Sequence, residues 1–176
     1  DQSLVYSMRG LFYLNDGDNQ NAIQDLENAA ALNPKNFQAF QGLGFELQKT
    51  GLYPEAVTAF DKAIALTPSD HVTISYRGYT HLNVKDYAKA LKDFDAAAKL
   101  APKEASYQTA RGDALKSSKS YPLAIAAYSK AIKLAPDQYG AYEGRGLAYA
   151  ALQDIDAAIA DFDAAIKLNP KASLSL

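Results

Sequence analysis

A 34-residue sequence pattern repeats five times along the chain without an insertion or deletion. Position 8 of every repeat is glycine, positions 20 and 27 are alanine, and position 32 is proline. A fixed period of this length predicts one structural unit built repeatedly, and therefore a single array over residues 1–176. The repeats are residues 3–36, 37–70, 71–104, 105–138 and 139–172, followed by a short tail of residues 173–176.

Each repeat predicts two helices. Positions 4, 7, 8 and 11 share one face of a first helix, and positions 20, 24 and 27 share one face of a second. A side chain at position 8 would overpack the crossing of the two helices by about 1–3 kcal/mol. Pro54 and Pro122 stand where the second helix should begin, and the prolines at position 32 follow its end. The linker is short, which makes the two helices antiparallel neighbours.

This pattern resembles the tetratricopeptide repeat family over residues 3–172. The resemblance implies an all-α fold, a right-handed α-solenoid of five helix-turn-helix repeats stacked side by side. Members of the family bind proteins, most often as peptide segments, on a concave wall lined by the first helices. The resemblance therefore implies a protein-protein interaction scaffold rather than an enzyme, with a protein or peptide partner.

In the family, positions 2, 5, 6, 9, 12 and 13 of the first helix face the groove. Carried over to this chain, these positions give a mildly apolar surface with hydrogen-bonding neighbours, which favours a partner with apolar side chains. For a single aromatic residue such as Phe45 or Tyr79, packing between adjacent first helices is an equally good interpretation. The clamp with which one subfamily reads chaperone tails is absent from these positions. The candidate groove residues are Leu11, Leu14, Gln41, Phe45, Gln48, Tyr76, Tyr79, Asn83, Asp113 and Lys116.

All four arginines of the chain occupy position 7. They could form a ladder that binds anions, or each could pair with an acid inside the stack. The second interpretation is favoured, because three of the four arginine-bearing repeats carry aspartate at position 23. Where the arginine is replaced by Leu43, the acid is replaced by Ala59, although Arg111 is matched only by Ala127. The predicted pairs are Arg9–Asp25, Arg77–Asp93 and Arg145–Asp161.

Composition excludes several other classes of function. The formal net charge is −2 and there is no run of lysine or arginine, so nucleic acid is not an expected partner. The chain has no cysteine and only two histidines, His71 and His81, which make a poor metal site. No cofactor is expected, because the glycine pairs at residues 42–44 and 144–146 lack the third glycine of a dinucleotide fingerprint. They are interpreted as position 8 plus a chance glycine at position 6.

The first predicted helix is unusually apolar for the end of a stack, since terminal repeats need a polar outer surface. Either the chain is excised from a longer array, or its ends dock onto other molecules. The second possibility includes a homo-oligomer formed through the terminal helices. No apolar run is long enough to span a membrane. The arginine-glycine style of repeat is similar to that of bacterial and organellar proteins, which leaves a bacterial cytoplasm or periplasm, or an organelle, as candidate compartments.

Overall fold

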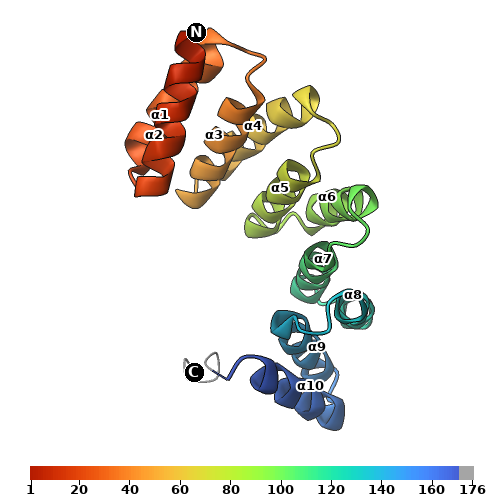
Figure 1. Cartoon of the computed structure of the whole chain (residues 1–176). Helices are drawn as coiled ribbons and strands as arrows, with labels where there is room; N and C mark the ends of the chain where they lie inside the picture. Colours follow the sequence, from red (N-terminus) through yellow and green to blue (C-terminus); the bar gives the residue numbers. More distant parts are fainter. Residues whose placement is uncertain (171–176) are drawn as a thin grey trace. The chain divides into compact units, whose positions relative to one another are not determined.

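The computed structural model describes residues 1–170, and this range is entirely helical apart from caps and turns (Figure 1). Within it lie ten helices and no strand, so the all-α fold class of helix-turn-helix repeats predicted from the sequence is confirmed. Residues 171–172 of the last predicted repeat and the tail of residues 173–176 lie outside the described residues. The helices are α1 (Gln2–Asp16), α2 (Asn19–Leu32), α3 (Phe37–Lys49), α4 (Tyr53–Leu66), α5 (His71–Asn83), α6 (Tyr87–Leu100), α7 (Ala105–Ser117), α8 (Tyr121–Leu134), α9 (Tyr139–Ala151) and α10 (Ile155–Leu168).

The helices divide into two compact units, of which the first comprises Asp1–Asp86 and the second begins at Tyr87. In the first unit each helix packs on the next one along the chain, from α1 to α5. In the second unit the same holds from α6 to α10. Odd-numbered helices are the first helices of the repeats and even-numbered helices are the second helices.

Helix boundaries follow from the side chains at the ends. The carboxylate of Asp18 accepts a hydrogen bond from the Asn21 amide at 3.2 Å, and Asn36 caps α3 through the Ala39 amide at 3.1 Å. Pro54 and Pro122 are the second residues of α4 and α8, within the first turn, where a missing N–H costs nothing. Helix ends and starts therefore coincide with the proline positions that the sequence pattern uses.

Position 15 of every repeat adopts a left-handed backbone conformation in the turn between the two helices. Gly17 and Gly51 have φ of 81° and 83°. In the other three repeats the same conformation is taken by Lys85, Lys119 and Gln153, with φ of 62–64°. A residue with a Cβ is strained in this conformation, so the glycines fit the turn better than their counterparts do.

The position-8 glycines allow the close crossing that the sequence predicts. A Cβ added at Gly44 or Gly112 would lie 2.6 Å from the ring of Phe60 or Tyr128, respectively. These rings occupy position 24 of the repeat, on its second helix, and are fully buried. The core of each unit is therefore an aromatic or leucine side chain on one helix set against the bare backbone of another.

The glycines at position 6 are not incidental, contrary to the interpretation drawn from the sequence. A Cβ at Gly144 would lie 2.5 Å from the ring of Tyr128, which belongs to the preceding repeat. A Cβ at Gly42 would lie 3.2–3.4 Å from Leu11 and Leu26. Consecutive repeats thus approach closely at position 6. The second glycine of each pair, at position 8, allows the two helices of the same repeat to approach closely.

Candidate functional site

The first unit carries an apolar cavity on the side formed by its first helices, α1, α3 and α5. The cavity has a volume of about 310 Å³, within the range of small binding pockets. Of the ten candidate groove residues, five line it: Leu11, Leu14, Gln41, Phe45 and Tyr76. Gln38, Gly42 and Val72 complete the lining, and they occupy the same repeat positions 2 and 6 that the family uses.

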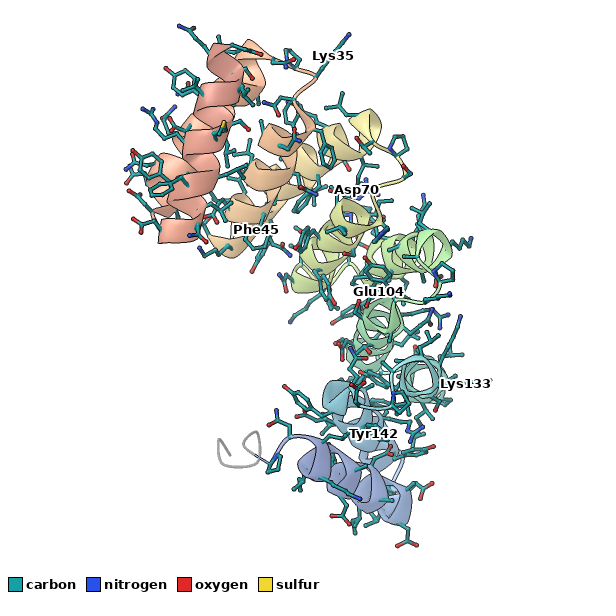
Figure 2. All side chains as sticks on the ribbon, in the orientation of Figure 1. Lys35, Phe45, Asp70, Glu104, Lys133 and Tyr142 are labelled. Atoms are coloured by element: carbon teal, nitrogen blue, oxygen red, sulfur yellow. The ribbon has the colours of Figure 1, made fainter. Side chains whose placement is uncertain are left out.

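Two aromatic rings form one wall of this cavity. The ring of Phe45, labelled on α3 in Figure 2, packs edge-on against Tyr76 with 5.5 Å between ring centroids. Tyr76 in turn stacks on the buried ring of Phe60, with centroids 6.1 Å apart. Tyr76 therefore packs against the core and also lines the cavity. Packing and ligand contact, the two alternative roles considered for aromatic residues in the groove, are thus compatible in one residue.

The Gln41 amide is engaged within the unit. Its Nε2 donates to Thr73 Oγ1 at 2.7 Å and to Asp70 Oδ2 at 3.2 Å. Asp70, labelled in Figure 2, caps α5 through the backbone amide of Thr73 at 2.8 Å. Gln41 therefore connects α3 to the start of the next repeat. Gln38, which also lines the cavity, is exposed, so its amide is accessible to a partner.

The remaining candidate residues do not line this cavity. Gln48 and Tyr79 are half-buried on α3 and α5, and Asn83 is exposed at the end of α5. Asp113 and Lys116 belong to the second unit, where they lie together on α7 with Lys116 Nζ 3.6 Å from Asp113 Oδ1.

Asp113 has a structural partner in the buried Tyr128. The phenol donates to Asp113 Oδ1 at 2.6 Å. Burial, followed by the charge of Asp113, raises the pKa of Tyr128 well above its ordinary value. The second unit thus presents a polar pair at the repeat positions where the first unit presents Leu11 and Leu14.

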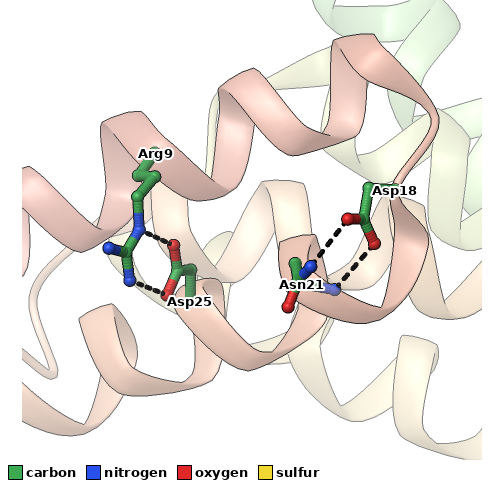
Figure 3. A network of polar contacts seen from close by, with 4 residues as sticks. All are labelled: Arg9, Asp18, Asn21 and Asp25. Atoms are coloured by element: carbon green, nitrogen blue, oxygen red, sulfur yellow. Dashed lines mark hydrogen bonds and ion pairs between the residues drawn. The ribbon is translucent and has the colours of Figure 1, made fainter.

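Arginine–aspartate pairs join the two helices of a repeat in both units. Arg9 donates from Nε and Nη2 to the two oxygens of Asp25, at 2.5 and 2.8 Å (Figure 3). Arg145 donates in the same way from Nε and Nη2 to the two oxygens of Asp161, each at 2.7 Å. Hydrogen bonding to these carboxylates raises the pKa of both guanidinium groups. The predicted pair Arg77–Asp93 connects residues of different units and stays a prediction.

Sequence reasoning missed a second partner of these arginines, at position 25 of the preceding repeat. Arg77 Nη1 lies 2.5 Å from Asp61, and Arg111 Nε lies 2.8 Å from Asp95. Arg145 bonds partners in both repeats: Asp161 in its own repeat, and Ser129 in the preceding one, to which its Nη1 donates at 2.9 Å. Each of these partners lies sixteen residues before the arginine, and the acids at position 25 were the signal that could have revealed them.

Other kinds of site find no support in the described part of the chain. Residues 1–170 contain no group of three or more histidine, cysteine or acidic side chains that could hold a metal ion. None of the helices in that range combines the length and the apolar character needed to cross a bilayer.

Comparisons with solved structures place the fold among known repeat proteins. A structure described as MamA 41-end from Desulfovibrio magneticus RS-1 has 25% identity and a TM-score of 0.89, with 97% of this chain and 96% of that chain covered. A MamA RS-1 double mutant has 23% identity and the same TM-score, with 99% and 98% covered. YrrB, described as a tetratricopeptide repeat protein with an unusual peptide-binding site, has 19% identity and a TM-score of 0.78, with 96% and 87% covered.

A search of curated proteins finds no match. The model of the tetratricopeptide repeat family, in contrast, matches residues 7–71, 77–139 and 119–173, which together span nearly the whole chain. The repeat spacing, the helix pairs and this match agree, and the chain belongs to the tetratricopeptide repeat family.

Proposed function

We propose that this protein is a non-enzymatic scaffold that binds a peptide segment or partner subunit through the first-helix face of its first unit. The apolar cavity between α1, α3 and α5 is the observation that carries the proposal. Phe45 and Tyr76 pack on each other in its wall. A preformed apolar pocket favours an aliphatic or aromatic anchor side chain, and the amide of Gln38 at its edge suits a partner's backbone.

A peptide-display selection on the intact protein tests this proposal. Leu11 is 39% exposed, so Leu11→Lys places a charge in the cavity at little cost to the core. Selected peptides should bind the wild type and lose at least about tenfold in affinity for Leu11→Lys by fluorescence anisotropy. Leu32→Lys, at a 52% exposed leucine at the end of α2, is the matched control and should bind normally. Equal loss in both variants, or no loss in either, would contradict binding at this cavity.

A second candidate function, self-assembly through the terminal helices, is favoured by the outer face of α1. Val5, Met8 and Phe12 are 64–66% exposed. At the positions of Val5 and Phe12 in the second repeat, Ala39 and Glu46 are fully buried. Packing of α1 against another copy would remove this apolar face from water.

Light scattering separates the two candidate functions. Self-assembly predicts a mass above that of the monomer for the wild type and a monomer for Val5→Glu, with peptide binding unchanged. Leu123→Glu, at a 57% exposed leucine of α8, is the control and should keep the wild-type mass. A monomeric wild type at high concentration would remove this candidate and leave the peptide scaffold untouched.

A further inference from the structure

The second unit contains a cavity of about 490 Å³ on the side formed by its second helices. It lies among α6, α7 and α8. Three basic side chains and one carboxylate line it, and their formal charges sum to +2. The lining is Asp95, Ala98, Lys99, Gln108, Arg111, Ala126, Ala127 and Lys130.

The guanidinium group of Arg111 has hydrogen-bond donors that the described residues do not engage. Its counterpart Arg145 bonds both oxygens of Asp161, but the fourth repeat has Ala127 at the position of that acid. Arg111 therefore holds Asp95 through Nε alone, at 2.8 Å. Within residues 1–170, its two terminal nitrogens make no hydrogen bond, and the side chain is 32% exposed. The terminal nitrogens with which an arginine normally forms a bidentate contact to a carboxylate therefore remain available to a ligand.

Gln108 is the second unusual feature. Position 4 is Tyr6, Phe40, Ile74 and Tyr142 in the other repeats, so an apolar side chain is the rule there. Gln108 is only 6% exposed and lines the cavity. Within residues 1–170 its amide makes no hydrogen bond, and its nitrogen and oxygen are not among the fully buried unpartnered atoms, so the amide is accessible from the cavity. A ligand acceptor in the cavity can therefore accept a hydrogen bond from its Nε2.

The first unit provides an internal comparison. The equivalent cavity, of about 670 Å³, stands between the first and second repeats. There the position of Gln108 holds Phe40, that of Arg111 holds Leu43, and that of Lys99 holds Ala31. Only Lys62 corresponds to a basic residue, Lys130. The polar and basic character therefore belongs to the junction of the third and fourth repeats and is not a property of the fold.

We propose that the α6–α7–α8 cavity binds a phosphate group. A phosphate monoester carries about −1.5 to −2 charge at neutral pH, which complements the surplus of positive charge in the lining. Its three terminal oxygens accept hydrogen bonds from the terminal nitrogens of Arg111, the Gln108 amide and the lysines at the rim. The volume leaves room for the molecule or side chain that carries the phosphate.

Titration of the isotope-labelled full chain, followed by NMR, tests this site. Inorganic phosphate, a phosphoserine peptide and acetate are added in separate arms at constant ionic strength. Phosphate should produce saturable shifts at Lys99, Gln108, Arg111 and Lys130, and acetate should bind at least about tenfold more weakly. Tighter binding of the phosphoserine peptide than of free phosphate identifies a phosphorylated side chain as the source, and the reverse order identifies a free phosphate.

Arg111→Leu copies the leucine of the second repeat and should weaken phosphate at least about tenfold. Lys130→Ala should weaken it several-fold, whereas the matched variant Lys62→Ala should not. Lys99→Ala, at an exposed residue, replaces Arg111→Leu if circular dichroism shows that the latter is unfolded. Shifts that do not saturate, equal affinity for acetate, or unchanged affinity in a folded Arg111→Leu or Lys99→Ala variant would overturn the proposal.

Discussion

At the scale of single residues, two glycines of one helix, α9, have different surroundings. Gly144 lies against Tyr128, and an added Cβ would come within 2.5 Å of the ring. Gly140 has open space around the same atom. We expect Gly144→Ala to lower the free energy of unfolding by about 1–3 kcal/mol through overpacking. Gly140→Ala should raise it by up to about 1 kcal/mol through helix propensity. Urea denaturation of both variants measures the difference, and a shared sign would contradict the packing at Tyr128.

The buried carboxylate of Glu46 is a local cost to stability. The side chain is fully buried, neither oxygen has a hydrogen-bond partner within residues 1–170, and Lys49 Nζ lies 3.6 Å away. The same repeat position holds Phe12 in the first repeat and Thr80, Ala114 and Ala148 in the third to fifth. We expect Glu46→Met to raise the free energy of unfolding by about 1–3 kcal/mol, because it replaces a buried carboxyl group that has no hydrogen-bond partner with an apolar side chain of similar volume. Chemical denaturation measures it. Lys49→Met should destabilise, and a less stable Glu46→Met would show that the carboxylate is needed.

The residues also show where sequence reasoning stops. Position 8 could be predicted because all five glycines agree, and the close crossing that they imply is present at Gly44 and Gly112. The close approach at Gly144 could not, because it depends on Tyr128 of the preceding repeat and on how two repeats stack. The arginine partners at position 25 were missed for the same reason. Contacts within a repeat follow from helical periodicity, whereas contacts between repeats need the stacking geometry.

At the scale of elements, the turn between the helices of a repeat is uneven along the chain. Gly51 and Lys119 hold the same left-handed conformation, at φ of 83° and 62°. We expect Gly51→Ala to lower the free energy of unfolding by about 1 kcal/mol, since alanine is strained there. Lys119→Gly should raise it by about 0.5 kcal/mol, because the relief of strain exceeds the added freedom of the unfolded chain. Denaturant midpoints test both changes. Destabilisation by Lys119→Gly would mean that the lysine side chain contributes more than its backbone costs.

Helices could be placed from the sequence more fully than the candidate site. Proline positions and apolar periodicity indicate where each helix lies. The groove, in contrast, was carried over from the family position by position. Five of its ten residues share one cavity, while Gln41 is engaged by the cap of the next repeat. A position that faces a groove in the family can be used by a structural hydrogen bond in a particular member, and only the coordinates of the neighbouring repeat reveal this.

At the scale of the whole molecule, a repeat array has no single core, so stability should fall toward a helix with fewer neighbours. The second unit allows a controlled comparison, because α8 and α10 carry isoleucine at the same two positions. Ile125 and Ile132 of α8 are partly buried against the core cluster, whereas Ile159 and Ile166 of α10 are 53% and 48% exposed.

We expect the backbone amides of α10 to exchange with solvent at least about tenfold faster than those of α8, since less apolar burial lowers the cost of local opening. Hydrogen exchange followed by mass spectrometry measures this at two protein concentrations. Equal protection of the two helices at both concentrations would contradict the gradient within the array. Protection of α10 that rises with concentration would instead show that another copy covers its isoleucines, and it would place the self-association surface at this end rather than on α1.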